Sequence, residues 1–170
     1  CMDDDDVRRG KPTVHRAYDE ATAVLAGDGL LTASFEILSR EAVHVDPHVR
    51  LALISQLAVA AGHSGMIGGQ MIDLTMDKRA STLETITQLQ DLKTGALMHY
   101  AVMAGATLAG ATETERKHLS AYGKHVGLIF QITDDVLDAQ GDPEIMGKAA
   151  NKDDSRGKAT FVSILGVDGA

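Results

Sequence analysis

Acidic side chains are concentrated in two short stretches of the sequence, and the second of them, DDVLD, could hold a hard metal ion. Its aspartates are Asp134, Asp135 and Asp138. On a helix, residues three or four apart share a face, so these carboxylates would point the same way. Oxygen ligands favour Mg²⁺ or a similar ion over zinc. An alternative interpretation of this segment alone is a solvated acidic helix end.

The first stretch is the run Asp3, Asp4, Asp5 and Asp6, which is followed at once by VRRGKP. Four adjacent carboxylates repel one another unless a positive charge lies among them. Alone, such a run is typical of a flexible, solvated tail. Arg8 and Arg9, however, offer planar guanidinium groups that suit phosphate oxygens. Because metal and arginine together commonly hold a diphosphate, we interpret the two acidic stretches as halves of one site.

The composition sets limits on the class of protein. The 170 residues are 44% apolar and 24% charged, which is typical of one soluble domain with a hydrophobic core. A net charge of -8 argues against non-specific nucleic-acid binding. The single cysteine, Cys1, excludes an internal disulfide framework. No signal peptide and no membrane-spanning apolar run is visible, which predicts a cytoplasmic protein.

Apolar spacing predicts long helices, and no stretch alternates as a strand would. Helical periodicity covers about 15–40, where GDG at 27–29 predicts an interruption with close packing or a kink. The helix expected at about 47–61 is apolar nearly all round, which predicts a central position. Small residues throughout 62–74 predict the close approach of another backbone.

Three helix starts are marked by their capping residues. Asp46 followed by Pro47 is typical of a first helical turn. Ser81 with Glu84, and Thr112 with Glu115, form capping-box patterns that open helices at about 82–106 and 113–139. We therefore expect one all-α domain of long helices, and the DDVLD carboxylates would lie near the end of the last helix.

Five blocks of sequence, in family order, resemble those of trans-prenyltransferases, above all bacterial farnesyl and geranylgeranyl diphosphate synthases. The blocks are CMDDDDVRRGKPTVH at 1–15, GHSGMIGGQMIDL at 62–74, LKTGAL at 92–97, GLIFQITDDVLDAQGD at 127–142, and GK at 147–148 with RGKAT at 156–160. The resemblance implies an isoprenoid synthase-type all-α bundle around a central cavity. Residues 1–170 would form a single, partial domain that is truncated at both ends.

The resemblance also implies a set of site residues. The metal ligands would be Asp3, Asp134, Asp135 and Asp138, with Mg²⁺, or alternatively Mn²⁺, as the cofactor. Asp3 matches the last aspartate of the family's first motif, whose earlier aspartates would precede Cys1. The substrate-binding residues would be Arg8, Arg9, Gln70, Lys93, Thr94, Phe130, Gln131, Lys148 and Lys158. Lys93, Thr94 and Gln131 would also act in catalysis, and Asp73 would line the cavity with Gln70.

The implied reaction is a Mg²⁺-dependent ionisation, condensation and elimination. Its substrates would be isopentenyl diphosphate and an allylic diphosphate, dimethylallyl or geranyl, and its product farnesyl diphosphate. A homodimer is implied as well.

Two alternatives to this function remain. A class I terpene cyclase shares the ionisation, but it does not need the second diphosphate's basic groups, such as Arg8 and Arg9. A non-catalytic remnant or partner subunit is favoured by the missing aspartates and disfavoured by the intact second motif.

Overall fold

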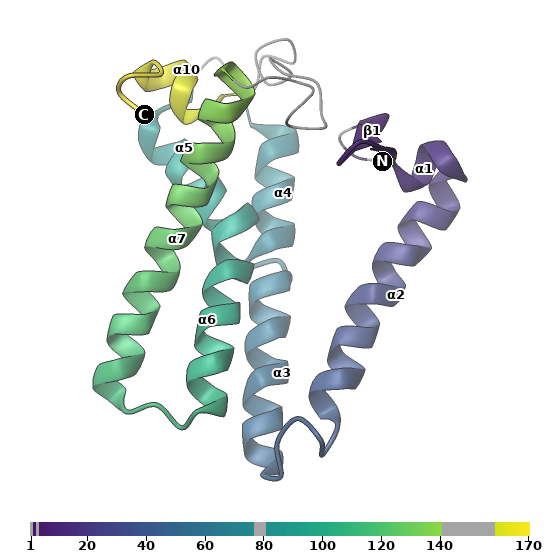
Figure 1. Ribbon diagram of the computed structural model, residues 1–170, viewed down its shortest axis with the longest axis vertical. Helices are drawn as coiled ribbons and strands as arrows, with labels where there is room; N and C mark the ends of the chain where they lie inside the picture. Colours follow the sequence, from purple (N-terminus) through teal and green to yellow (C-terminus); the bar gives the residue numbers. More distant parts are fainter. Residues whose placement is uncertain (1, 3, 77–80, 141–158) are drawn as a thin grey trace.

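The computed structural model describes residues 2, 4–76, 81–140 and 159–170, and the regular structure in them is almost entirely helical (Figure 1). In chain order the elements are β1 (Val7–Arg8), β2 (Lys11–Pro12), α1 (Val14–Ala17), α2 (Glu20–Ser39), α3 (Pro47–Ala61), α4 (Met66–Thr75), α5 (Leu83–Gln90), the π-helix η2 (Asp91–Gly95), α6 (Ala96–Leu108), α7 (Glu113–Gln140) and α10 (Phe161–Leu165). The predicted all-α class is confirmed. The two strands, which were not expected, form a hairpin too short to show periodicity.

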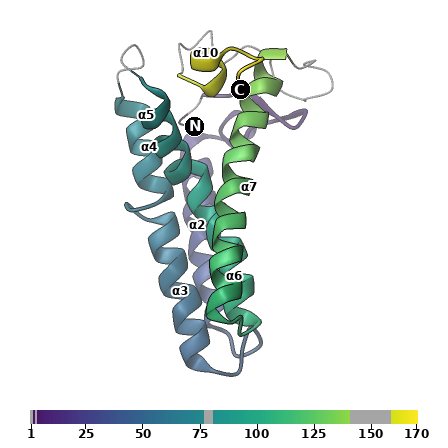
Figure 2. The same cartoon turned by 90° about the vertical axis from the view of Figure 1, so that its left-hand side faces the viewer.

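The long helices contact one another in a simple order. Helix α7 packs against α6, α6 packs against α3, and α2 packs against α3 (Figures 1 and 2). The short helix α10 lies against α7 at the end of the bundle where α7 finishes (Figure 2). Contacts also join η2 to α4 and to α7. Side chains from several segments can therefore come together where these three elements meet.

Two of the three predicted helix starts are confirmed. The Asp46 carboxylate accepts a hydrogen bond from the backbone N–H of His48 at 2.8 Å, and Pro47 occupies the first turn of α3. At the start of α7, the Glu115 carboxylate accepts from the Thr112 N–H at 2.7 Å, while Thr112 Oγ1 accepts from the Glu115 N–H at 3.4 Å. These reciprocal bonds satisfy backbone donors that the helix itself leaves unpaired.

The third start lies one residue later than predicted. Thr82, not Ser81, caps α5, because Thr82 Oγ1 accepts from the Thr85 N–H at 3.2 Å. The Thr85 hydroxyl accepts in return from the Thr82 N–H at 2.8 Å. A threonine thus takes the place that the pattern assigned to Glu84. From α5 the chain continues through η2 into α6, so the predicted long helix contains a π-helical turn.

The GDG prediction is wrong for the described structure. Helix α2 runs without interruption from Glu20 to Ser39. A Cβ atom added to Gly27 or Gly29 would meet no described atom within 4 Å, so neither glycine is required by close packing.

Helix α3 is central on one side only. Leu53, Leu57 and Ala61 are buried, whereas Leu51 and Val59 are exposed to solvent. The apolar composition predicted burial on all sides, but the described parts of the neighbouring helices α2, α4 and α6 leave these two side chains uncovered.

The sequence predicted no membrane-spanning helix, but two helical stretches are long and apolar enough to be candidates. By length and composition alone, α2 and the stretch Pro47–Thr75, which contains α3 and α4, would suffice to cross a membrane. Charged residues such as Asp28 and Glu36 interrupt the apolar runs of α2, but the mean hydropathy of the helix remains high enough to meet this criterion. Core helices of water-soluble proteins meet the same criterion, so the absence of a membrane span stays a prediction.

Glycines allow very close packing around η2. A Cβ atom on Gly69 of α4 would lie only 2.6 Å from Cα of Lys93, and one on Gly127 of α7 would lie 3.0 Å from Cα of Gly95. The first distance is shorter than real Cβ atoms show and the second is tighter than nine in ten real Cβ contacts, so both helices contact the π-helical backbone directly. The predicted backbone approach in 62–74 is confirmed. A π-helical turn between two such contacts is a feature often found at functional sites.

His99, in the first turn of α6, joins this helix to α7. Its Nε2 lies 2.8 Å from the Ser120 hydroxyl, and a Cβ atom on Gly123 would lie 3.3 Å from Cα of His99. Burial, aided by the positive charge of Lys124, lowers the pKa of His99 below its ordinary value. The folded protein therefore favours the neutral imidazole.

We expect this histidine to make the protein less stable in acid. Because its pKa is lower in the folded state, its contribution to stability is complete above the unfolded pKa of about 6.5 and declines as the pH falls below that value. Changing His99 to glutamine should reduce the loss of unfolding free energy between neutral and mildly acidic pH, measured by urea denaturation. The exposed His125 in α7, changed to glutamine, is the control. An unchanged pH dependence in H99Q would contradict the assignment.

Candidate functional site

The basic residues near the chain start lie on the β1–β2 hairpin. The strands pair Val7 with Pro12 and Arg8 with Lys11. Between them, Arg9 and Gly10 have φ values of 53° and 72°, so both central turn residues are left-handed, as two-residue hairpins require. Arg8 and Arg9 are exposed on this hairpin, and neither forms an ion pair with another described residue. Both guanidinium groups are thus accessible to an anionic ligand.

The positive charge among the first aspartates comes from α1, not from Arg8 and Arg9. Arg16 Nη2 lies 3.3 Å from Asp4 Oδ1, and Arg16 Nε donates to Asp6 Oδ1. His15 Nε2 lies 3.7 Å from the same Asp4 oxygen. Sequence reasoning missed Arg16, because nothing in the spacing of residues ten apart indicates that α1 folds back on the run. Both carboxylates are exposed, so these pairs contribute little to stability but hold the segment in shape.

A half-buried ion pair connects α4 to η2. Lys93 Nζ lies 2.7 Å from Asp73 Oδ2, and the two side chains are 24% and 15% exposed. The close approach at Gly69 brings Lys93 near enough to α4 for this contact. Lys93 and Asp73 were both expected to line the site, but their pairing was not predicted.

A chain of hydrogen bonds continues from η2 through α7 to α10. Thr94 Oγ1 donates to Gln131 Oε1 at 3.3 Å, and Gln131 Nε2 donates to Asp135 Oδ1 at 2.8 Å. The other carboxylate oxygen of Asp135 accepts from the backbone N–H of Phe161 at 2.9 Å. We call Asp73, Lys93, Thr94, Gln131 and Asp135 the polar network. It joins α4, η2 and α7, and the Phe161 N–H connects it to α10.

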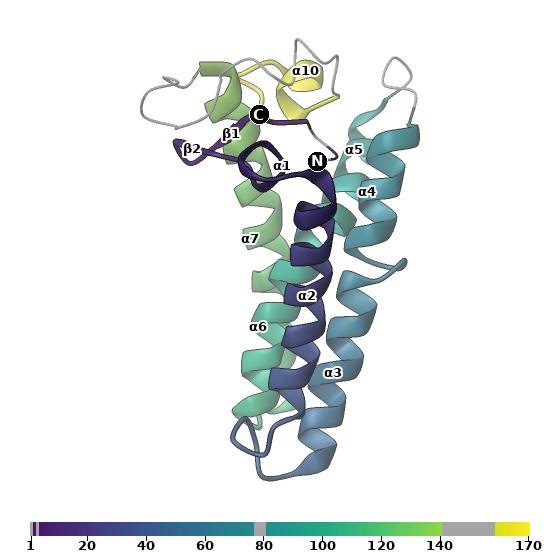
Figure 3. The ribbon, with the colours of Figure 1, turned by 90° about the vertical axis from the view of Figure 1, so that its right-hand side faces the viewer.

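The chain start also reaches this region. Gln70 Nε2 lies 3.7 Å from the sulfur of Met2, and Gln70 is one helical turn before Asp73 on α4. Figures 1 and 3 show the N-terminal hairpin and the C-terminal end of α7 at the same end of the bundle. This arrangement agrees with two acidic stretches that serve one site.

The carboxylates of the second motif differ in burial. Asp135 is 3% and Asp138 5% exposed, whereas Asp134 is half-buried. The prediction that this helix face points inward is confirmed for the two buried aspartates. Among the described residues, no three His, Cys, Asp or Glu side chains come together as a metal site. Magnesium is commonly held by one or two carboxylates with substrate phosphates, and the oxygen donors at this helix end fit that chemistry.

The remaining predicted site residues are divided between exposed and undescribed positions. Phe130 is exposed, and it takes no part in the polar network although it adjoins Gln131. Asp3, Lys148 and Lys158 lie outside the described residues.

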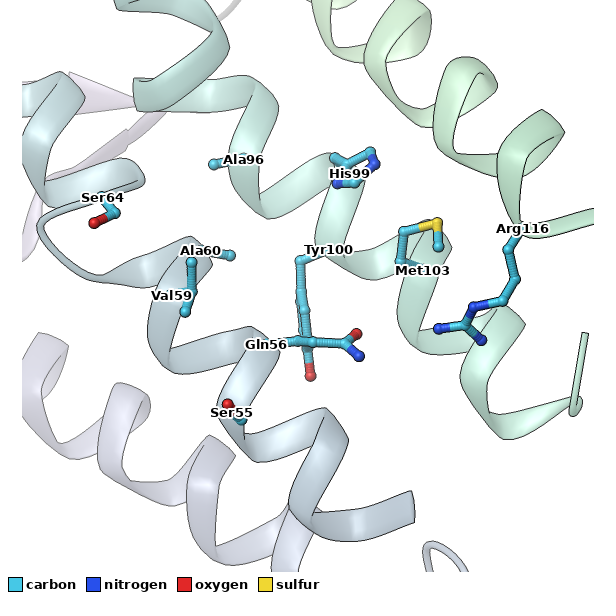
Figure 4. A pocket seen from close by; sticks show the side chains of 10 residues that line it. All are labelled: Ser55, Gln56, Val59, Ala60, Ser64, Ala96, His99, Tyr100, Met103 and Arg116. Atoms are coloured by element: carbon cyan, nitrogen blue, oxygen red, sulfur yellow. The ribbon is translucent and has the colours of Figure 1, made fainter. Parts of the chain in front are cut away.

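A separate cavity of about 400 Å³ opens between α3 and α6 (Figure 4). Its lining consists of Ser55, Gln56, Val59, Ala60, Ser64, Ala96, His99, Tyr100, Met103 and Arg116. None of the predicted substrate or metal residues is among them. Burial raises the pKa of Tyr100, which is neutral in any case at ordinary pH. We therefore place the candidate active site at the polar network and not at this cavity.

Comparisons with known proteins give the context of this site. All residues, 1–170, match the family model described as polyprenyl synthetase. Farnesyl diphosphate synthase of Bacillus subtilis is 46% identical over 171 residues, which cover 100% of this chain and 58% of that protein. The chain thus spans somewhat more than half the length of the curated relatives it matches.

Solved structures give the same result. The apo structure of an FPP/GFPP synthase from Zymomonas mobilis is 51% identical with a TM-score of 0.84, covering 99% of this chain and 56% of that one. A geranyltransferase from Helicobacter pylori, complexed with magnesium and isoprenyl diphosphate, is 39% identical with a TM-score of 0.88, covering 99% and 55%.

The helical bundle agrees with the solved structures, as the TM-scores of 0.84 and 0.88 show. The family match extends over every residue of the chain, so no part of the described structure stands outside it. The chain belongs to the polyprenyl synthetase family.

Proposed function

We propose that the protein is a short-chain prenyl diphosphate synthase that condenses an allylic diphosphate, dimethylallyl or geranyl, with isopentenyl diphosphate. Farnesyl diphosphate is the expected product, because several of the most similar relatives are farnesyl diphosphate synthases. The observation that carries the proposal is the convergence of Lys93, Thr94, Gln131 and Asp135 from separate segments into one network. These residues belong to the sequence blocks in which the chain resembles those enzymes.

The diphosphate groups would be held at the acidic and basic ends of the site. Asp134, with Asp138 and Asp3, would hold Mg²⁺, which when bound supplies positive charge to the leaving diphosphate. The Helicobacter pylori relative, whose structure contains magnesium and isoprenyl diphosphate, supports this cofactor. Arg8 and Arg9 would grip diphosphate oxygens from the hairpin, where both guanidinium groups are accessible. Lys148 and Lys158 would add positive charge from the segment after α7.

The reaction begins when the allylic C–O bond breaks and its electron pair leaves with the diphosphate. The double bond of isopentenyl diphosphate then attacks the allylic cation and forms the new C–C bond. Loss of a proton, taken by the released diphosphate, completes the product. Lys93 stabilises the negative charge on the leaving group, while the oxygens of Thr94 and Gln131 face the developing cation. Apolar helices exclude water, which would otherwise trap the cation as an alcohol.

We also infer that the protein is a cytoplasmic homodimer that binds no nucleic acid. No residue of α2 is buried, and Leu25 and Leu30 are among its exposed apolar side chains. A second copy of the chain over α2 would remove them from water. The net charge of -8 disfavours nucleic acid. Light scattering during size-exclusion chromatography measures the oligomeric state directly.

The function is tested with the protein expressed from its complete gene. Radiolabelled isopentenyl diphosphate and geranyl diphosphate are supplied with Mg²⁺, and the products are dephosphorylated and separated by chain length. We expect labelled farnesol, and no product after chelation of the metal. A terpene cyclase would instead release hydrocarbon from the allylic substrate without consuming isopentenyl diphosphate. Failure to incorporate label would favour a non-catalytic subunit.

A further inference from the structure

We propose that Asp135 is a positioning residue that sets the orientation of the Gln131 amide, and that it is not a direct metal ligand. The inference rests on the proposed function, because that function makes Gln131 part of the reacting site. It also differs from the sequence prediction, in which Asp135 was grouped with Asp134 and Asp138 as a ligand.

The contacts of Asp135 are those of a structural carboxylate. Its side chain is 3% exposed, and each of its oxygens accepts a hydrogen bond from another described group. One donor is Gln131 Nε2 at 2.8 Å, on the preceding turn of α7. The other is the backbone N–H of Phe161 at 2.9 Å, at the first turn of α10. The carboxylate therefore fixes two segments at once, whereas half-buried Asp134 is the more accessible carboxylate of the motif.

The chemistry of these groups determines which way the Gln131 amide points. An ionised carboxylate can only accept hydrogen bonds, so the NH₂ end of Gln131 must face Asp135. The amide oxygen then points the other way, where it accepts from Thr94 Oγ1 at 3.3 Å. The position of the nitrogen and oxygen in an amide is decided by its neighbours, and here the deciding neighbour is Asp135.

This orientation matters for a reaction that passes through a carbocation. An amide oxygen presents negative dipole to a developing positive charge, whereas an NH₂ group presents positive dipole. If the Gln131 amide rotated by half a turn, its NH₂ group, which is a donor, would face Thr94 in place of its oxygen, which is an acceptor. Asp135 would thus influence the reaction through Gln131, without contacting substrate or metal.

A reciprocal exchange of side chains tests this directly. In D135N, the introduced asparagine has only one acceptor oxygen, so the Gln131 amide can turn over and aim its NH₂ group toward Thr94. In Q131E, the carboxylate of the introduced glutamate faces the carboxylate of Asp135. Neither group can donate the hydrogen bond that joins residues 131 and 135 in the wild-type protein. The double variant D135N/Q131E restores the pattern, because the introduced amide donates to the introduced carboxylate. The amide oxygen still accepts from the Phe161 N–H, and the carboxylate presents an oxygen toward Thr94.

We expect each single variant to lower kcat about 100-fold, and the double variant to recover most of that loss. The Mg²⁺ concentration for half-maximal rate should stay unchanged in D135N. If the double variant is no faster than D135N, or if D135N raises the Mg²⁺ requirement, Asp135 does not act by positioning Gln131. The reaction is run with the protein from its complete gene.

A second readout needs neither metal nor substrate. Protection of the Phe161 amide from hydrogen exchange and the melting temperature should both fall in Q131E, where two carboxylates repel each other, and recover in the double variant. Both should stay close to wild type in D135N, because the introduced asparagine still accepts from the Phe161 N–H. If wild-type protein condenses no isopentenyl diphosphate, the proposed function fails, yet this recovery still tests the hydrogen-bond arrangement. If stability recovers but kcat does not, the link from Asp135 to catalysis is overturned while the proposed function stands.

Discussion

Changing Gly69 to alanine is expected to destabilise the protein by about 3 kcal/mol, because the new methyl group has no space. Its Cβ would lie 2.6 Å from Cα of Lys93, and the atoms it meets are backbone that cannot rotate away. Either α4 or η2 must move, and the Asp73–Lys93 ion pair lies between them. We therefore expect a fall in both unfolding free energy, measured by urea denaturation, and prenyl transfer activity.

The matched control is another helical glycine with open surroundings. A Cβ atom on Gly105 of α6 would meet no described atom within 4 Å. Alanine there should stabilise the protein by up to about 1 kcal/mol, since alanine is a better helix former than glycine. The two substitutions are chemically identical and should have opposite signs. A similar effect of G105A and G69A would show that close packing at η2 is not what Gly69 provides.

The second large effect is expected at Asp134. Changing it to asparagine removes the negative charge of the accessible carboxylate in the second motif. A bound metal ion contributes several kcal/mol to transition-state stabilisation, so we expect kcat to fall about 1,000-fold and the Mg²⁺ requirement to rise. Steady-state assays over a range of Mg²⁺ concentrations measure both quantities in the protein from its complete gene.

E113Q at the exposed start of α7 serves as the control for this variant, since it also removes one carboxylate. It should leave kcat and the Mg²⁺ requirement unchanged. The melting temperature of D134N shows whether the fold is intact. A folded D134N protein with wild-type Mg²⁺ dependence would contradict the assignment of Asp134 as a ligand. The contrast between D134N and D135N separates a metal ligand from a positioning residue.

Local signals in the sequence were sufficient for much of the fold. The starts of α3 and α7 were predicted from Asp46 and from Thr112 with Glu115, because a cap acts on the backbone within a few residues of itself. The error at α5 was one residue, since Thr82 with Thr85 competes for the same role as Ser81 with Glu84. The all-α class followed from helical periodicity, which is likewise local.

The sequence by itself also determined the family and the residue types at its site, because five blocks matched in order. Only the tertiary structure decided which residues contact each other when they lie far apart in the sequence. Glycines at 27, 29 and 69 look alike in sequence, yet only Gly69 contacts another backbone. Arg16 as the partner of Asp4, Lys93 as the partner of Asp73, and the role of Asp135 at α10 depend on which elements meet in space. Short-range patterns carry no information about those meetings, because close packing of distant segments sets them.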